Sequence, residues 1–564
     1  MKFEDFEYTR PVMADFNARF DQLLTAFEAA ENFENQSQIL VQIDSLRTEF
    51  ATMFNICHIR HTINTADNFY EQENDFFDEN SPLTEALTNR YYGAILQTPF
   101  RKELEAVWGS QLFVIAELSL KTFRPEILED MQDENRLSSE YTKLKASAKI
   151  HFDGKDYNLS SIFPVETSPD RDLRRRASAA KWSFYAEIAE KNEIIFDNLT
   201  KTRHRMAQSL GYQNYVGLGY ARMLRSDYDA AKVADFRQQI LQHVVPVAAA
   251  LYEKQRVRLG LEKLKFYDEE FRFASGNPKP KGEPAWILKN AVQMYSELSP
   301  ETKEFFDFMC QNNLMDLEAK DGKAPGGYCT YIGDHHSPYI FSNFNGTSGD
   351  IDVLTHEAGH AFQVYSSRNV GLSDYQCPTY EACEIHSMSM EFFTWKWMHL
   401  FFEEDTDKYK FAHLSGAILF LPYGVAVDEF QHFVYENPDA SIAERNTAWR
   451  NIEKKYLPWR DYDGNEFLES GGYWQKQSHI FNSPFYYIDY TLAQICAFQY
   501  WSWERKNPKA AWDSYVKLCK AGGSHSFLDL VKSAGLRSPF EEGCVSEVVA
   551  DIRAWLDTVK DATF

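Results

Sequence analysis

Apolar residues recur at three- and four-residue spacing along much of the chain, which is the pattern of helices with one buried face. Clear examples run from Phe16 to Phe27 and from Leu40 to Phe54. Because this spacing dominates the sequence, we expect a mainly α protein.

The clearest exception to the helical pattern is KIHFDGKDYNL, residues 149–159, where a DG dipeptide joins two short alternating runs. This arrangement is typical of a β-hairpin with a two-residue type I′ turn. A helix start follows it, since Thr167 or Ser168 can serve as the cap, with Pro169 and Asp170 in the first turn. The sequence therefore predicts a small β element followed by a helix.

Two further segments divide the chain. Ser275–Pro284 concentrates proline, glycine and lysine, which excludes a continuous helix or a central strand and predicts a loop. Tyr339–Phe344 follows a proline and is rich in aromatic residues, which favours a short strand. We expect a helical N-terminal part, residues 1–200, and a part that carries the chemistry, residues 201–564.

A helix is predicted from Asp352 onward, because DVLTHEAGHAFQVYSSR has candidate caps upstream and contains no proline. His356 and His360 stand one turn apart on it, about 5–6 Å from each other, so both imidazoles can reach a single ion. Glu357 follows the first histidine and can hold the water that a metal polarises. The small residues Ala358 and Gly359 permit close packing. This segment predicts a site for one zinc ion with Glu357 as general base.

A catalytic zinc usually takes three protein ligands and leaves a fourth position for water. The segment TYEACEIHSMSMEFF offers Glu381, Glu384 and Glu391 at three- and seven-residue spacing, which places them along one stripe of a second helix. We assign Glu384 as the third ligand, and Glu381 and Glu391 as acceptors outside the coordination sphere that orient the histidines or polar backbone. Asp352 is expected in the same outer set. Simple solvation is the alternative for Glu381 and Glu391. His386 has either a packing or a substrate role.

These motifs resemble those of a known enzyme family. HEAGH at 356–360, followed by Glu384 in CEIHSMSMEFF, is similar to the motifs of the thimet oligopeptidase and oligoendopeptidase F superfamily, and within it to the oligoendopeptidase F and Pz-peptidase branch. The likeness runs from the hairpin to Trp503. It implies that two histidines and Glu384 bind zinc and that Glu357 is catalytic. It also implies a large multi-helix body in two halves around a deep channel for short, flexible peptides.

A second motif, HIFNSPFYYIDYTLAQ, resembles the substrate-binding segment of that family. Tyr486, Tyr487 and Tyr490 fall on one helical face, and His479 precedes them by two turns. The resemblance implies that His479 and Tyr490, with Tyr486 or Tyr487, donate hydrogen bonds to the oxyanion and the substrate backbone. Ordinary aromatic packing is the alternative for this face. GKAPGGYCTY resembles a glycine-rich strand region of the family, and SPYIFSNFNGTSGD resembles an edge strand that leads into the metal helix. An exposed strand edge can pair with an extended peptide, and a purely structural strand is the alternative.

Composition restricts the possible partners. The 564 residues are 44% hydrophobic and 25% charged, as in soluble globular proteins, and we expect no membrane-spanning segment. A net charge of -24 opposes nucleic-acid binding, so no nucleic-acid partner is expected. The eight cysteines contain no C-x-x-C pair and the first residues lack a secretory signal, which indicates a cytoplasmic protein with reduced thiols.

Together these features predict a zinc endopeptidase for short oligopeptides, acting as a monomer or a small homo-oligomer. One alternative is a zinc exopeptidase, either an aminopeptidase or a dipeptidyl carboxypeptidase. The G-x-M-E-N signature of glutamate-rich aminopeptidases is absent. The other alternative is a non-catalytic peptide-binding protein with structural zinc, which would normally recruit a fourth protein ligand.

Overall fold

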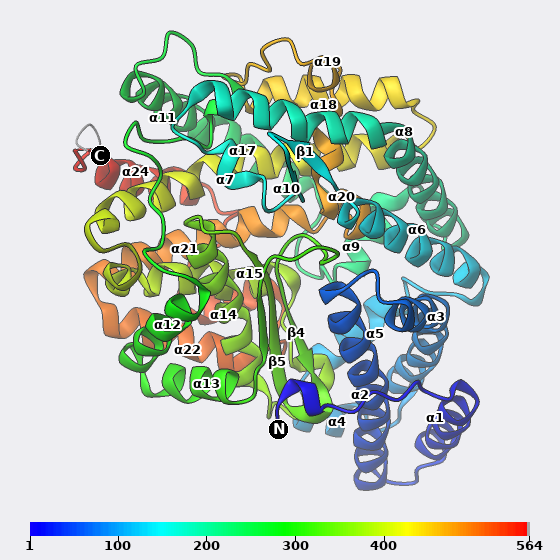
Figure 1. The fold of residues 1–564 in the computed structure, drawn as a ribbon. Coiled ribbons are helices and arrows are strands. Elements are labelled where there is room, and N and C mark those ends of the chain that lie inside the picture. Colours follow the sequence, from blue (N-terminus) through cyan, green and yellow to red (C-terminus); the bar gives the residue numbers. More distant parts are fainter. Residues whose placement is uncertain (561–563) are drawn as a thin grey trace.

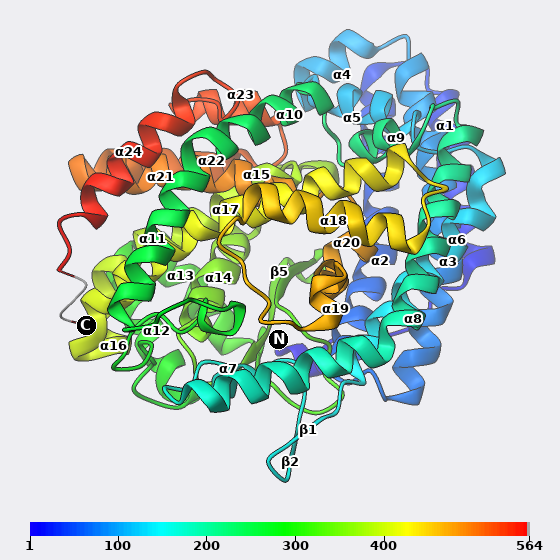
Figure 2. The same cartoon turned by 90° about the horizontal axis from the view of Figure 1, so that it is seen from above.

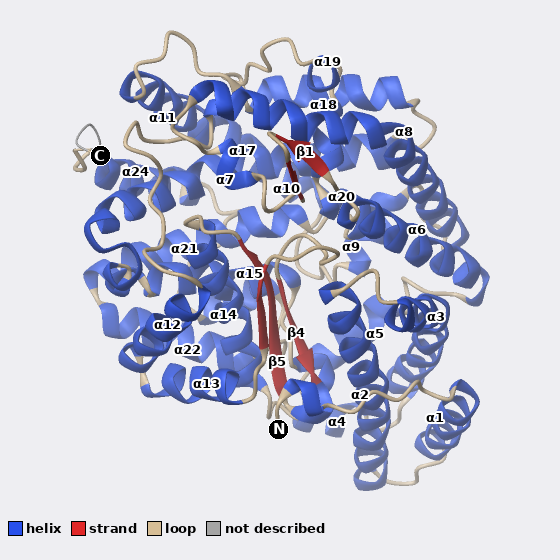
Figure 3. Ribbon diagram, viewed as in Figure 1, coloured by secondary structure: helices blue, strands red, loops and turns tan. Residues whose placement is uncertain are grey.

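The computed structural model describes residues 1–560 and 564, and its fold is mainly helical (Figure 1). Helices make up 70% of the structure. Within the described residues the strands form one two-stranded and one three-stranded sheet. Figure 3 shows these strands, in red, among helices that surround them. The prediction of a mainly α protein is confirmed.

The first helices of the chain share a hydrophobic cluster of their own. Their bounds are α1 Met13–Glu28, α2 Phe33–Ile63, α3 Asn68–Gln97, α4 Arg101–Trp108 and α5 Gln111–Ser119. The helical pattern predicted over 16–27 is confirmed, because Phe16, Phe20, Leu24 and Phe27 are all buried in α1. They pack with Leu40 and other apolar residues of α2, α3 and α5. These helices therefore form one packed group around an apolar centre.

The predicted β-hairpin is present and projects from the body of the protein (Figure 2). It follows α6 (Leu128–Ala146) and consists of the antiparallel strands β1 (Ile150–Phe152) and β2 (Lys155–Tyr157). Both turn residues have positive φ, 47° at Asp153 and 78° at Gly154, as a type I′ turn requires. The sequence thus predicted both the strands and the turn.

The helix after the hairpin begins later than its sequence suggests. After the short α7 (Phe163–Glu166), the long helix α8 spans Arg171–Ser209, and its cap is Asp170. The Asp170 carboxylate accepts hydrogen bonds from two amides of the first turn, so the prediction of Thr167 or Ser168 as the cap is wrong. The predicted boundary near residue 200 falls within α8, and the division into two parts stays a prediction.

The middle of the chain is helical as far as the second sheet. Its helices are α9 Tyr215–Arg222, α10 Ala230–Gln239, α11 Val245–Arg258, α12 Pro284–Leu298 and α13 Pro300–Gln311. The predicted loop is confirmed between Ser275 and Glu283, and Pro284 is the first residue of α12. Proline suits this first position because its missing amide would have no helical partner there.

A three-stranded sheet leads directly into the helix with the two histidines. Its strands are β3 Met315–Glu318, β4 Tyr328–Ile332 and β5 Ser337–Phe344, in the order β3-β5-β4. β5 contains the predicted strand 339–344, runs antiparallel to β4 and parallel to β3, and is largely buried. The expectation of an edge strand in the segment that leads into the metal helix is wrong, because that segment is β5, which is paired on both sides; β4 is an edge strand instead.

The remaining helices build the largest part of the core. They are α14 Gly349–Ser367, α15 Tyr380–Phe393, α16 His399–Phe402, α17 Thr406–Glu436, α18 Ile442–Tyr456, α19 Glu466–Glu469, α20 Ser478–Asn482, α21 Tyr487–Lys506, α22 Pro508–Ala521, α23 Phe527–Ser533 and α24 Cys544–Leu556. α15 packs against both α14 and α21. The contact with α14 is close, since a Cβ at Gly359 would lie 2.6 Å from Ser387 Cα and 2.7 Å from His386 O.

One helical stretch is long and apolar enough to cross a membrane when judged by length and composition alone. It covers His399–Glu436 and has a mean hydropathy of 1.3 in its most apolar window. However, 67% of this window is buried inside the protein, where its side chains belong to the main hydrophobic cluster. The stretch thus contributes to the core.

We expect the close approach of α14 and α15 to make Gly359→Ala costly. The added methyl group would overlap backbone atoms of α15, and overpacking of this kind lowers the free energy of unfolding by about 1–3 kcal/mol. Urea denaturation of the purified variant measures this loss.

A suitable control is Gly93→Ala in α3, where the nearest atom to the new Cβ, Leu120 Cδ2, lies 4.0 Å away. Because alanine favours helix more than glycine does, this control should keep or slightly raise stability. Equal stability of the two variants would contradict the packing argument.

Candidate metal centre and active site

The helix α14 places two histidines on the same face. His356 and His360 are one turn apart, and their ring centroids lie 5.1 Å from each other. The start of the helix is fixed by Asp350, whose carboxylate accepts hydrogen bonds from the amides of Asn345 and Gly346 at 2.9 and 2.8 Å. The segment that connects β5 to α14 is therefore held by hydrogen bonds to the first turn of the helix.

Glu384 of α15 reaches both histidines. Its Oε2 atom lies 3.2 Å from His356 Nε2 and 3.3 Å from His360 Nε2. These three residues form the one group in the described part of the chain whose possible ligand atoms all lie within 4.8 Å of one another. Two imidazoles and a carboxylate are a ligand set that suits zinc and leaves room for a fourth ligand. The donor set thus fits a catalytic metal ion.

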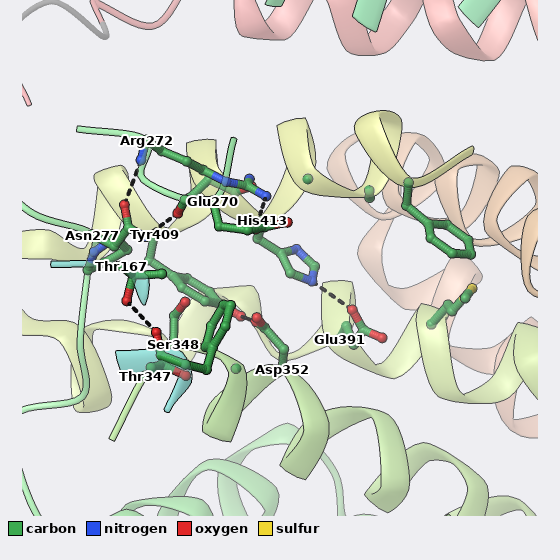
Figure 4. A pocket seen from close by; sticks show the side chains of 18 of the residues that line it. Thr167, Glu270, Arg272, Asn277, Thr347, Ser348, Asp352, Glu391, Tyr409 and His413 are labelled. Atoms are coloured by element: carbon green, nitrogen blue, oxygen red, sulfur yellow. Dashed lines mark hydrogen bonds and ion pairs between the residues drawn. The ribbon is translucent and has the colours of Figure 1, made fainter. Parts of the chain in front are cut away.

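The carboxylate of Glu391, on the same helix as Glu384, orients His356. Glu391 Oε1 lies 2.7 Å from His356 Nδ1 and holds the proton there, so Nε2 is the ring nitrogen that would bind a metal. Glu391 Oε2 lies 2.7 Å from His413 Nε2, and the indole of Trp395 donates to His413 Nδ1. Figure 4 shows the Glu391 and His413 side chains directed at each other. Glu391 therefore lies where the sequence assignment requires.

Two side chains of this hydrogen-bond network lie in parts of the sequence that contain no recognisable motif. His413 belongs to α17, and Trp395 follows the end of α15. Neither residue belongs to a motif. A histidine on an apolar helix is common in protein cores, so its role is visible only once α17 packs beside α15.

Glu357 lies next to His356, which with His360 and Glu384 forms what we call the metal group. One oxygen of the Glu357 carboxylate, Oε2, has no hydrogen-bond partner among the described residues. The side chain is buried, and burial raises its pKa although the neighbouring imidazoles oppose the shift. Gly327, beside the start of β4, leaves space here, since a Cβ at this position would lie 3.3 Å from Glu357 Oε1. A buried carboxylate with a free oxygen can accept a proton from water.

The structure distributes the other predicted acids over different environments. Asp352 accepts a hydrogen bond from the Tyr409 hydroxyl at 2.6 Å, one turn before His356. Glu381 is fully buried, but it accepts no hydrogen bond from His356 or His360. It faces Arg225, which opposes the rise that burial causes in its pKa. Glu381 is thus not brought to the histidines.

His386, whose role the sequence left open, points into the core. Its side chain is fully buried, and burial lowers its pKa to about 4, so the ring is neutral near pH 7. Tyr515 of α22 donates to its backbone carbonyl at 2.8 Å. This environment favours the packing role.

The histidine-and-tyrosine motif forms the opposite wall of the site. His479 of α20 lies 3.1 Å from the Tyr490 hydroxyl through Nε2, and Gln477 Nε2 donates to its Nδ1 at 2.7 Å. Burial lowers the pKa of His479 to about 4, so the ring is neutral and carries its proton on Nε2. This tautomer donates, as the prediction for His479 requires.

The structure also distinguishes the two adjacent tyrosines. The Tyr486 hydroxyl donates to Glu384 Oε1, which places it at the metal group. Tyr487 instead packs edge-on against the rings of Phe420 and Tyr423, with centroids 5.8 Å away in each case. Of the pair, Tyr486 is therefore the residue that faces the metal ligands.

Two cavities are lined by residues that neighbour His356, His360 and Glu384. One, of about 520 Å³, is lined by Asp352 and Glu391, which Figure 4 labels, and by His479 and Tyr490 among others. We call it the Glu391 cavity. A second, of about 580 Å³, includes Tyr486 and extends to helices of the N-terminal group, and we call it the Tyr486 cavity. Each cavity is thus lined by a residue that contacts this group, Glu391 in the first and Tyr486 in the second.

Comparison with known proteins identifies the class. The model of peptidase family M3 matches residues 165–549, and that of the peptidase M3 N-terminal domain matches residues 3–123. The chain therefore belongs to peptidase family M3, which confirms the resemblance seen in its motifs.

Several solved structures are similar over the full chain. A Pz-peptidase A with an inhibitor is 59% identical, with a TM-score of 0.99 and 100% of both chains covered. A protein from Bacillus anthracis described as an oligoendopeptidase F is 55% identical, with a TM-score of 0.95, 100% of this chain covered and 99% of the other. These neighbours place the chain in the oligoendopeptidase F and Pz-peptidase branch of the family.

Curated relatives are more distant. An oligoendopeptidase F homolog of Borreliella burgdorferi is 27% identical over 386 residues, which cover 65% of this chain and 62% of that protein. Oligopeptidase PepF of Bacillus subtilis is 21% identical over 557 residues, which cover 91% of this chain and 80% of that protein. The match to the Borreliella protein thus spans less than two thirds of its length.

The hydrogen bond from His356 to Glu391 leads to a prediction about metal affinity. The substitution Glu391→Gln removes the negative charge that orients and polarises the imidazole of His356. The affinity for a divalent ion should therefore fall about 10- to 100-fold. Competition against a chromophoric chelator, with Zn²⁺ as the probe ion, measures this change.

Glu187→Gln in α8 is the control, because this glutamate is exposed to solvent and should not alter metal affinity. An unchanged affinity in Glu391→Gln would show that the hydrogen bond does not support the metal.

Proposed function

We propose that the protein is a zinc-dependent endopeptidase that hydrolyses internal bonds of short, unstructured oligopeptides. The observation that supports this best is the convergence of His356, His360 and Glu384 beside Glu357, whose free oxygen faces no other described partner. Membership of peptidase family M3 supports the same conclusion from an independent direction.

His356, His360 and Glu384 would hold the ion, with Glu391 keeping His356 in the metal-binding tautomer. A zinc ion bound in this way lowers the pKa of a water ligand towards about 7 and polarises a carbonyl group. This ligand set differs from that of closed structural sites, which usually have four protein ligands.

Proton transfer is the role of Glu357. Its carboxylate takes the proton of the attacking water and then delivers it to the leaving amine, so the group ends each cycle as it began. Burial favours this exchange because it weakens the preference of the carboxyl group for the ionised form.

The charge that develops on the carbonyl oxygen requires donors. The Nε2–H of His479 and the hydroxyl of Tyr490 lie on the wall opposite α14 and can donate to it, with a contribution of roughly 10²–10³ in rate for each donor. The neutral state of His479 suits this role, since it donates without releasing its proton near pH 7.

An extended peptide would run from the Glu391 cavity across the metal group into the Tyr486 cavity. These spaces, about 520 and 580 Å³, fit a few side chains each and exclude a folded domain. We therefore propose that they belong to a channel between two halves of the protein. The free edge of β4 would bind the peptide backbone without regard to side chains.

Glu357→Gln tests the proposed mechanism. The variant should bind zinc with the stoichiometry of the original protein, because Glu357 is not a ligand, while kcat falls by about 10²–10⁴-fold. Metal analysis and a fluorogenic peptide assay measure the two quantities. Glu187→Gln, an exposed substitution, should match the original in both. Substantial turnover by Glu357→Gln would refute the assigned role.

Digestion of a short peptide acetylated at its N-terminus and amidated at its C-terminus tests the endopeptidase assignment. Because both ends are blocked, we expect internal cleavage that stops with a chelator and returns with added Zn²⁺. Mass spectrometry of the products locates the cut. If only peptides with a free end are cleaved, the protein is an exopeptidase.

A further inference from the structure

We propose that Arg225 is a positioning residue that fixes the turn before α21 and thereby presents Tyr486 and Tyr490 to the reacting peptide. This inference rests on the proposed function, which gives Tyr490 a catalytic role, and it adds Tyr486, whose hydroxyl donates to Glu384. It adds to the site a residue that belongs to no recognised motif and lies outside the metal ligands.

The guanidinium group of Arg225 binds two points on the segment that carries the tyrosines. Its Nη2 atom donates to the carbonyl oxygen of Phe485 at 2.5 Å and to Asp489 Oδ1 at 2.7 Å. Both charged side chains are completely buried, at 0% exposure. In a setting of this kind hydrogen bonds between charged groups are strong and their geometry is well defined.

The two points are those that immediately precede the tyrosines in sequence. Phe485 comes before Tyr486, which donates to Glu384 Oε1, and Asp489 comes before Tyr490, which meets His479. Arg225 thus holds the backbone of the turn at one tyrosine and the first helical turn of α21 at the other. A shift of either point would move a hydroxyl group relative to the metal ligands.

The turn needs external support because its conformation is unfavourable. Phe485 has a φ of 67°, in the left-handed region that a bulky residue rarely adopts. Besides Arg225, Gln431 accepts a hydrogen bond from the Phe485 amide at 2.8 Å. The Phe485 ring fits against Gly219 of α9, where a Cβ would lie 2.6 Å from Phe485 Cδ2. Residues from two separate segments, α9 with the turn after it and α17, therefore fix this single turn.

Acidic and aromatic side chains surround the guanidinium group of Arg225. Asp489 and Glu381 of α15 both face it, and the rings of Tyr220 and Tyr228 lie 4.4 and 5.4 Å from its Cζ atom. Lysine would keep the positive charge but lacks the planar fork of arginine. Arg225→Lys thus changes geometry while it preserves charge.

The experiment compares the zinc-loaded original protein with Arg225→Lys on the blocked peptide. We expect kcat to fall by about 10- to 100-fold, since small displacements of catalytic groups have effects of this size, while KM and zinc content stay within about twofold. A readout independent of activity is hydrogen exchange of the metal-free protein, which should be faster in residues 483–492 of the variant. The matched control is Arg174→Lys, another buried arginine that binds backbone carbonyls and a buried aspartate, Asp268.

A combined variant separates positioning from general stability. If Arg225 acts through the tyrosines, adding Arg225→Lys to Tyr486→Phe/Tyr490→Phe should lower kcat by less than about twofold further. If Arg225→Lys does not fold, Asp489→Asn, which keeps an acceptor oxygen, should show the same pattern with a several-fold loss.

Unchanged kcat in the soluble variant, or losses that multiply in the combined variant, would overturn the positioning role. A loss equal to that of Arg174→Lys would do the same. These outcomes leave the proposed function intact as long as the original protein cleaves the blocked peptide and Glu357→Gln does not. Failure of that cleavage would instead overturn both proposals.

Discussion

The carboxylate of Glu384 is the group on which the geometry of the site depends, because it is contacted from two histidines, a serine and a tyrosine. His356 and His360 approach its Oε2 atom from α14, Ser387 donates to the same atom at 2.8 Å, and Tyr486 donates to Oε1. Burial opposes ionisation of Glu384, but the two imidazoles hold its pKa well below its usual range. A buried carboxylate can remain charged only with such partners. The contacts that keep Glu384 ionised are therefore the same contacts that form the candidate metal site.

Three helices, α14, α15 and α21, meet at this carboxylate, and a different interaction fixes the position of each. The missing side chain of Gly359 brings α14 against the backbone of α15. Within α15, Glu384 faces the metal group and Glu391 braces His356 from behind. The start of α21 is held by the buried bonds of Arg225 to the turn and to Asp489. Steric fit, a charged hydrogen bond and a buried ion pair thus determine relative positions that helix formation alone leaves free.

Local patterns in the sequence were sufficient for the helical class, the hairpin and the convergence of His356, His360 and Glu384. They were less reliable for the acids of α15, and helix geometry explains why. Successive residues differ by about 100°, so seven positions bring Glu391 within about 20° of Glu384, whereas three positions leave Glu381 about 60° away. Glu391 therefore reaches His356, while Glu381 faces Arg225. No spacing rule could reveal Arg225, since its partners lie more than 250 residues later in the chain and meet it only through packing.

His356 and His479 of the candidate site receive opposite tautomers from opposite partners. His356 faces the acceptor Glu391 at Nδ1, which places the proton there and frees Nε2 to bind a metal. His479 faces the donor Gln477 at Nδ1, which places the proton on Nε2, beside Tyr490. One imidazole is thereby prepared to give an electron pair and the other to give a hydrogen bond. The same side chain performs both tasks because the neighbouring residue, an acid in one case and an amide in the other, decides which nitrogen is protonated.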